Sequence, residues 1–109
     1  MEAKELRIGN WLMGYDGMPA QITLNDFVTH SNNVDIDEIF KSFIPMTEEW
    51  LIKFGFIVTR TRWRKGVLVI SQYGNRFIYR STHTEIKYAH QLQNLYFALA
   101  GQELTIKEL

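Results

Sequence analysis

Apolar residues recur at helical spacing near the C-terminus, in the stretch Tyr88–Gly101. At about 100° per residue, one arc of such a helix collects five side chains: Tyr88, Leu92, Leu95, Tyr96 and Leu99. Neighbouring alanines add helix propensity, and Gly101 suits the position after the last turn, where a left-handed backbone is needed. The pattern predicts an amphipathic helix over residues 88–101 whose apolar stripe covers the strands that precede it.

The first half of the chain alternates apolar and polar positions over short runs, which are separated by turn residues. These runs predict five strands and, at residues 37–40, one helical turn; the strands are 11–13, 20–24, 27–30, 34–36 and 43–44. Five short strands in so small a segment predict an SH3-like small β-barrel over residues 1–46. A strongly bent meander is the alternative.

A short helix is predicted directly after this segment. Thr47 suits the N-cap position, and Glu48 and Glu49 suit the first turn, where the helix dipole favours acids. Gly55 suits the end of the helix. The predicted helix therefore covers residues 48–54.

Alternating strands fill the region between the two predicted helices. They are expected over residues 56–64, 67–72 and 76–80, with turns at 65–66 and 73–75. Residues 103–107 are expected to add an edge strand. The predicted fold class is α+β: a small barrel or meander, a short helix, and antiparallel strands covered by a C-terminal amphipathic helix.

The composition is that of a folded protein. With 109 residues, 46% of them apolar and 14% aromatic, the chain is large enough to bury one core. We expect a single compact domain over residues 1–109, with sub-domains 1–46 and 47–109 as the alternative. Cysteine is absent, which excludes disulfides and thiolate sites. No secretory signal or membrane-spanning run is apparent, so we expect a cytoplasmic protein without membrane insertion.

The charges are separated along the chain, although the formal net charge is zero. Residues 16–49 contain seven acids and one base, whereas residues 50–84 contain seven bases and no acid. Either the two blocks neutralise each other, within one molecule or between copies, or the basic block faces an anionic partner such as nucleic acid. The zero net charge weakens the second interpretation, because dedicated nucleic-acid binders are usually basic overall.

Basic and aromatic residues interleave in the predicted strands. The candidate nucleic-acid contacts are Arg60, Arg62, Arg64, Lys65, Arg76 and Arg80. The candidates for stacking on bases are Trp63, Tyr73 and Tyr79. In a continuous strand, however, Trp63 and the neighbouring arginines lie on opposite faces. That geometry favours a core tryptophan and a solvated arginine face over nucleic-acid contact.

The predicted C-terminal helix carries a second set of residues on the face opposite its apolar stripe. His90, Asn94 and Phe97 follow one another at i, i+4 and i+7. They are a candidate contact strip for a protein partner or a second copy of the chain. The alternative is that Phe97 packs on the N-terminal half of the chain, because most large aromatic side chains are buried.

Motifs for catalysis and metal binding are weak. Residues 33–38 begin like a calcium loop, but Glu38 occupies the position that needs glycine, and Ile44 the position that needs glutamate. No ligand spacing links the three histidines, His30, His83 and His90. No nucleophile–base pair is apparent either. We therefore predict no catalytic residue, no metal ligand and no cofactor.

Three blocks of the sequence resemble one known family: LRIGNWL (Leu6–Leu12), IPMTEEWLIKFGF (Ile44–Phe56) and IKYAHQLQNLYFALAGQELTIK (Ile86–Lys107). The family consists of short proteins encoded by gut anaerobes and their prophages. The blocks occur in the family's order and cover both ends and the middle of the chain. The resemblance implies a bacterial, intracellular or phage-related setting, and it implies no activity, cofactor or catalytic residue.

Together these observations predict a small, non-catalytic binding module, of the kind that serves a phage or mobile element. Its contact surface would be the basic sheet or the His90, Asn94 and Phe97 strip. The alternative is a structural protein that self-associates when the acidic block of one copy meets the basic block of another.

Overall fold

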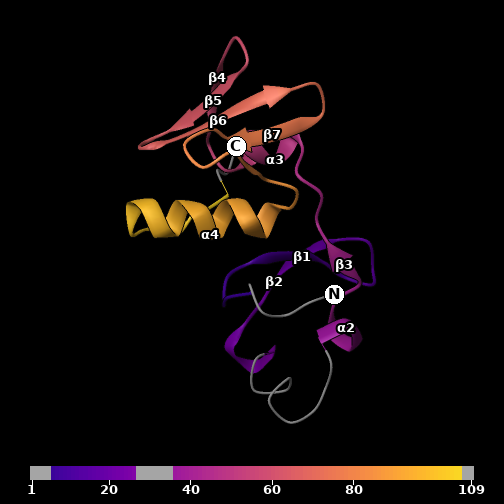
Figure 1. The fold of residues 1–109 in the computed structure, drawn as a ribbon. Helices are drawn as coiled ribbons and strands as arrows, with labels where there is room; N and C mark the ends of the chain where they lie inside the picture. Colours follow the sequence, from indigo (N-terminus) through magenta and orange to yellow (C-terminus); the bar gives the residue numbers. More distant parts are fainter. Residues whose placement is uncertain (1–5, 27–35, 107–109) are drawn as a thin grey trace. The chain divides into compact units, whose positions relative to one another are not determined.

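The computed structural model describes residues 6–26 and 36–106 of the chain. The chain divides into two compact units, Met1–Ile44 and Pro45–Leu109, which we call unit 1 and unit 2. Each unit contains one antiparallel sheet, so the predicted α+β class is confirmed (Figure 1). The predicted strand over residues 27–30 lies outside the described residues, as do the first two residues of the strand predicted over 34–36. The third, Ile36, is helical, so the predicted strand is wrong at that residue.

The described part of unit 1 is a three-stranded sheet around a small apolar core. Its strands are β1 (Trp11–Met13), β2 (Pro19–Gln21) and β3 (Ser42–Phe43), in the order β2-β1-β3. One helical turn, α2 (Ile36–Ile39), precedes β3 as predicted. The buried core consists of Leu6, Leu12, Ile22, Ile36 and Phe40. Within residues 6–26 and 36–44 the strands do not close into a barrel, so the SH3-like detail of the prediction is not confirmed.

The second strand of unit 1 is shorter than predicted, because a turn interrupts it. The backbone N–H of Thr23 donates to Asp26 Oδ2 at 2.7 Å, and the backbone N–H of Asp26 donates to the Thr23 hydroxyl at 3.3 Å. This reciprocal pair is a capping box, which begins a helical turn at Leu24. The expected strand over residues 20–24 therefore ends at Gln21.

Unit 2 is a five-stranded meander with a helix before it and a helix after it (Figure 1). The sheet order β4-β5-β6-β7-β8 follows the chain, and every neighbouring pair is antiparallel. The elements are α3 (Glu48–Lys53), β4 (Ile57–Thr59), β5 (Arg62–Lys65), β6 (Leu68–Tyr73), β7 (Arg76–Tyr79), β8 (Thr84–Glu85) and α4 (Ala89–Ala100). Residues 103–106 form no strand, so the predicted C-terminal edge strand is wrong over that stretch.

Helix α3 begins and ends where the sequence predicts. The Thr47 hydroxyl accepts a hydrogen bond from the Trp50 backbone N–H at 3.4 Å, which caps the first turn. Gly55 follows the last turn with a φ of 86°. So short a helix depends on tertiary packing, and Leu51 and Phe54 are both fully buried.

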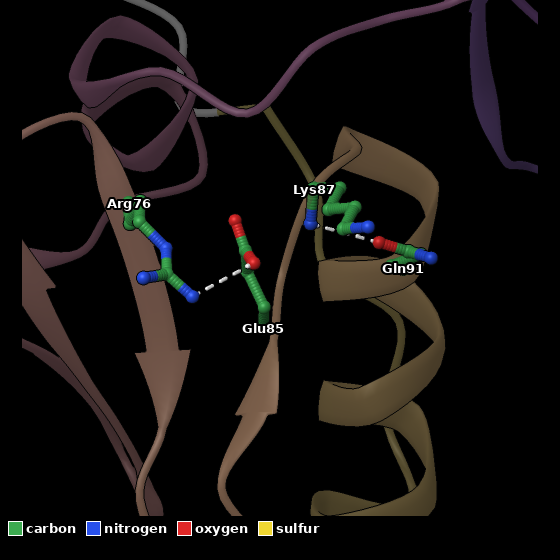
Figure 2. A network of polar contacts seen from close by, with 4 residues as sticks. All are labelled: Arg76, Glu85, Lys87 and Gln91. Atoms are coloured by element: carbon green, nitrogen blue, oxygen red, sulfur yellow. Dashed lines mark hydrogen bonds and ion pairs between the residues drawn. The ribbon is translucent and has the colours of Figure 1, made fainter.

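Helix α4 is also confirmed, with different capping at each end. Gly101 ends the helix with a φ of 70°, in the left-handed region. At the start, Gln91 Oε1 accepts hydrogen bonds from the backbone N–H groups of Lys87 at 2.8 Å and Tyr88 at 3.2 Å (Figure 2). The side chain of Gln91 thus holds the chain that enters the helix.

The two helices of unit 2 lie against one face of its sheet. Successive residues of a strand point to opposite faces, and one face buries Trp63, Leu68, Ile70 and Phe77. We call it the core face. Lys65, on that face, contacts both the end of α3 and the Tyr96 ring of α4. The other face is not covered in this way, and most of its side chains are exposed.

The buried side of α4 differs from the predicted stripe. Its buried residues are Ala89, His90, Leu92, Gln93 and Tyr96, whereas Leu99 of the predicted stripe is 42% exposed. The buried face is rotated by about a quarter turn from the apolar stripe. The sequence predicts that the polar residues of this helix are exposed. In the structure, the imidazole of His90 and the amide of Gln93 are buried along with the apolar side chains.

Candidate functional site

The predicted single strand over residues 56–64 is a hairpin, and that prediction is wrong. Strands β4 and β5 pair antiparallel, with Thr59 opposite Arg62 and Ile57 opposite Arg64. Arg60 and Thr61 form the turn between them, and Arg60 has a φ of 59°. No glycine marks this turn, so the alternation of arginines suggested one long strand. Arg60 therefore lies at a turn and not on the strand face of the other two arginines.

Cross-strand pairing places Arg62, Arg64 and Arg76 on the solvent side of the sheet. Residues directly opposite each other share a face, so Arg62 lies beside Ser71, and Arg64 beside Val69. The same face continues through Tyr73, which lies opposite Arg76. We call this surface the arginine face; it is formed by Ile57, Thr59, Arg62, Arg64, Val69, Ser71, Tyr73, Arg76, Ile78 and Glu85.

Four of the six predicted contact residues have no internal counter-charge. Within the described residues, Arg60, Arg62, Arg64 and Arg80 form no ion pair. Arg76 is different, because its guanidinium lies 3.2 Å from the carboxylate of Glu85 on the neighbouring strand (Figure 2). An exposed arginine that the protein does not neutralise is available to an anion in solution.

The sixth predicted contact, Lys65, is used inside unit 2. It follows Arg64 directly and so points to the core face. Its Nζ donates to the Phe54 backbone oxygen at 2.7 Å and lies 5.8 Å from the centroid of the Tyr96 ring. The acceptor is an otherwise open carbonyl at the end of α3, where a positive charge is favoured. The structure thus makes Lys65 a helix C-cap.

Replacing Lys65 with methionine is expected to lower the free energy of unfolding by about 1–2 kcal/mol, because a charge-assisted hydrogen bond at a helix end is lost. Urea unfolding followed by tryptophan fluorescence measures this change. Arg64→Met is the matched control, since Arg64 is exposed and should change stability by no more than about 0.5 kcal/mol. Equal losses in the two variants would contradict the capping role.

Two hollows in the surface of unit 2 share Arg62. The first, of about 960 Å³, runs along the β4–β5 hairpin and includes Ile57, Arg60, Arg62, Arg64 and Lys65 in its lining. The second, of about 530 Å³, has as its polar lining residues Arg62, Ser71, Tyr79, Arg80, Ser81 and His83. Neither hollow has a carboxylate among its described lining residues. Cations therefore dominate the local potential in both.

The candidate stacking residues fall in three different environments. Trp63 is buried, and its indole N–H donates to Gln72 Oε1 at 2.9 Å, so it is a core residue as the alternation suggests. Tyr73 is 52% exposed on the arginine face. Tyr79 is half-buried and lines the second hollow. Of the three, Tyr73 has the ring that a ligand on the arginine face can reach.

Sequence reasoning missed the part that Ser71, Ser81 and His83 play in the second hollow. They come from β6 and from the loop between β7 and β8, and only the strand register brings them near Arg62. In the sequence, His83 has no neighbouring residue at a spacing that indicates a site. Its φ of 53°, which is uncommon for a residue other than glycine, is visible only in the structure.

The predicted partner strip on α4 does not form one exposed surface. His90 is fully buried, Asn94 is half-buried, and Phe97 is exposed. The imidazole of His90 stacks on the Tyr88 ring, with 5.8 Å between ring centroids. Phe97 alone of the three presents a large exposed surface, and partner binding by the strip stays a prediction.

Residues 6–26 and 36–106 contain no group of three or more metal-ligating side chains. The residues that resemble the start of a calcium loop, 33–35, lie outside the described part, as does His30. Among the described helices, none combines the length and apolar character needed to cross a membrane. No protein-family model, curated protein or solved structure matches the chain.

Proposed function

We propose that the chain is a small, non-catalytic binding module, and that its arginine face binds single-stranded nucleic acid inside a bacterial cell or one infected by a phage. The observation that carries this proposal is a set of four arginines, Arg60, Arg62, Arg64 and Arg80, that form no ion pair with any described residue and line two hollows with no carboxylate in their described lining. Arginines that are only hydrated at the surface have no need to be kept apart from carboxylates.

The division into two units removes the main objection, which is the zero net charge. Unit 1 has three Lys and Arg residues against seven Asp and Glu, a formal charge of −4. Unit 2 has nine against five, a formal charge of +4. The arginine face therefore belongs to a unit with a clearly positive formal charge. The zero net charge of the whole chain hides this, because the acidic residues of unit 1 cancel it in the sum.

Single strands suit this surface better than a duplex. Arg62 and Arg64 are two residues apart on one strand, so their backbones lie about 6.6 Å apart, comparable with the spacing of successive phosphates in an extended strand. Tyr73 lies on the same face, two residues along β6 from the partner of Arg62, and offers an exposed ring for base stacking. An open sheet that carries both cations and an aromatic ring is a common platform for unpaired bases.

The opposite charges of the two units also favour a second candidate function, self-association between copies. Such contacts weaken with salt, because they depend on exposed charges. A monomeric elution volume at high protein concentration and low salt would exclude this second function and leave the first intact.

The test is a titration of a fluorescent oligothymidylate with the full chain at several salt concentrations, followed by anisotropy. Three or four phosphate contacts predict that the logarithm of the association constant falls with the logarithm of salt concentration, with a slope of about −2 to −3. A duplex of the same length is expected to bind more weakly. Absence of binding at low salt would refute the proposal, and tighter duplex binding would refute its single-strand part.

A further inference from the structure

Three segments of unit 2 line the second hollow, which is an open depression in the surface. Its floor is β6, where Ser71 is almost fully buried but still lines the hollow. Arg62 lies across from Ser71 on one side, on β5. On the other side of β6, Arg80 directly follows the last residue of β7.

Arg62 and Arg80 both line the second hollow. Ile78 is two strand spacings of about 4.8 Å from Arg62, and Arg80 lies two residues further along the chain, so the backbones of Arg62 and Arg80 are about 12 Å apart. The long guanidinium side chains span the space between them. Together they offer a forked set of donors to one group, the arrangement that suits an oxyanion.

The loop between β7 and β8 lines the third side of the hollow. One of its residues, His83, has an uncommon backbone conformation. His83 adopts a φ of 53°, and its backbone N–H donates to the Arg80 carbonyl oxygen at 3.3 Å. Glycine or asparagine occupies such a position with less strain. The side chain of His83 lines the hollow together with the two arginines, which adds an imidazole to its hydrogen-bonding groups.

We infer that this hollow binds a terminal phosphate monoester, the phosphorylated end of the nucleic acid strand, an inference that rests on the proposed function. A monoester carries about −1.5 to −2 charges near neutral pH and three free oxygens. An internal phosphodiester carries a single charge and two free oxygens. Two arginines, an imidazole and two serine hydroxyls from three sides match the richer acceptor.

The shared residue Arg62 gives the bound strand a direction. The terminal phosphate occupies the second hollow, and the following phosphates pass Arg62 into the first hollow, toward Arg64 and Arg60. The structure thus predicts recognition of strand ends together with general affinity for the strand.

The experiment compares three oligothymidylates with an internal fluorophore: 5′-phosphorylated, 3′-phosphorylated and unphosphorylated, the last longer by two nucleotides so that its two additional phosphodiesters match the charge of a terminal monoester. One of the two phosphorylated strands is expected to bind about tenfold more tightly than the unphosphorylated strand, through the charge-assisted bonds of the hollow. Which end is preferred reports the direction of the strand.

Variants locate the preference. Arg80→Gln and His83→Gly are expected to abolish the tenfold ratio. Arg80→Gln also weakens binding to the unphosphorylated strand a few-fold, because it removes one arginine of the proposed interface, whereas His83→Gly retains that binding and relieves backbone strain, so its folding is secure. Arg76→Gln removes the same charge outside the hollow and is expected to keep the ratio. Equal affinity for all three strands would overturn this inference and leave the proposed function standing, whereas absence of binding to any strand would overturn both.

Discussion

Replacing Leu92 with alanine is expected to lower the free energy of unfolding of unit 2 by about 3–4 kcal/mol. Leu92 has no exposed surface, and it lies on the buried side of α4. Truncation removes the buried methyl groups and leaves a cavity that a close-packed core fills only in part. A unit of this size has a total stability of about 3–10 kcal/mol, so much of it is lost. The unfolding transition is expected to move to clearly lower urea concentration.

Leu99→Ala is the matched control on the same helix. Leu99 belongs to the apolar stripe predicted from the sequence, but it is 42% exposed, so its truncation is expected to change stability by less than about 1 kcal/mol. In a Trp11→Phe background the remaining tryptophans, Trp50 and Trp63, report on unit 2 alone. A loss at Leu99 as large as that at Leu92 would mean that α4 packs on its predicted stripe and not on the face described here.

Reversing the charge of both strand arginines, Arg62→Glu with Arg64→Glu, is expected to weaken binding of single-stranded oligonucleotide by at least about 100-fold. Each arginine loses a charge-assisted hydrogen bond to phosphate, and each glutamate adds repulsion. Both side chains are exposed, so the fold is expected to tolerate the change. Anisotropy titration at low salt measures the loss, and a smaller salt slope is expected to accompany it.

Two controls separate local contact from overall charge. Lys87→Glu makes the same kind of charge change at an exposed residue before α4 that lines neither hollow, and is expected to weaken binding only a few-fold. Lys65→Met is expected to leave affinity nearly unchanged while it lowers stability, because Lys65 points to the core face. If Lys87→Glu weakened binding as much as the reversed pair does, general electrostatic attraction, and not contact with the arginine face, would explain the binding.

Local signals in the sequence predict the helices of unit 2 well, because their ends depend on nearby residues. Thr47 caps α3 through a bond to a residue three positions later, and Gly101 supplies the left-handed residue that ends α4. The turns at Gly66 and Gly74 are equally local, since each glycine takes a positive φ between two strands. Such features are decided over a few residues, so the sequence alone is sufficient.

The candidate site is less predictable, because it depends on which strands are neighbours. The alternation of Arg62 and Arg64 around Trp63 places the arginines opposite a core residue, and that prediction agrees with the structure. The turn at Arg60 and the inward position of Lys65 escape such a pattern, since neither has a sequence signal of its own. A lysine in a basic run looks the same in sequence whether it faces solvent or caps a helix.

The sequence by itself determined the α+β composition, the capped helices, the separation of acidic and basic blocks and the absence of thiol chemistry. Only the tertiary structure decided which side of α4 is buried, because His90 and Gln93 are polar and their burial depends on what packs around them. It alone joined Arg62, Ser71, Arg80 and His83 into one hollow, because strand register brings together residues that are distant in sequence. The periodicity of apolar and polar residues indicates which face of a strand carries a side chain. Only the pairing of the strands shows which other side chains lie beside it.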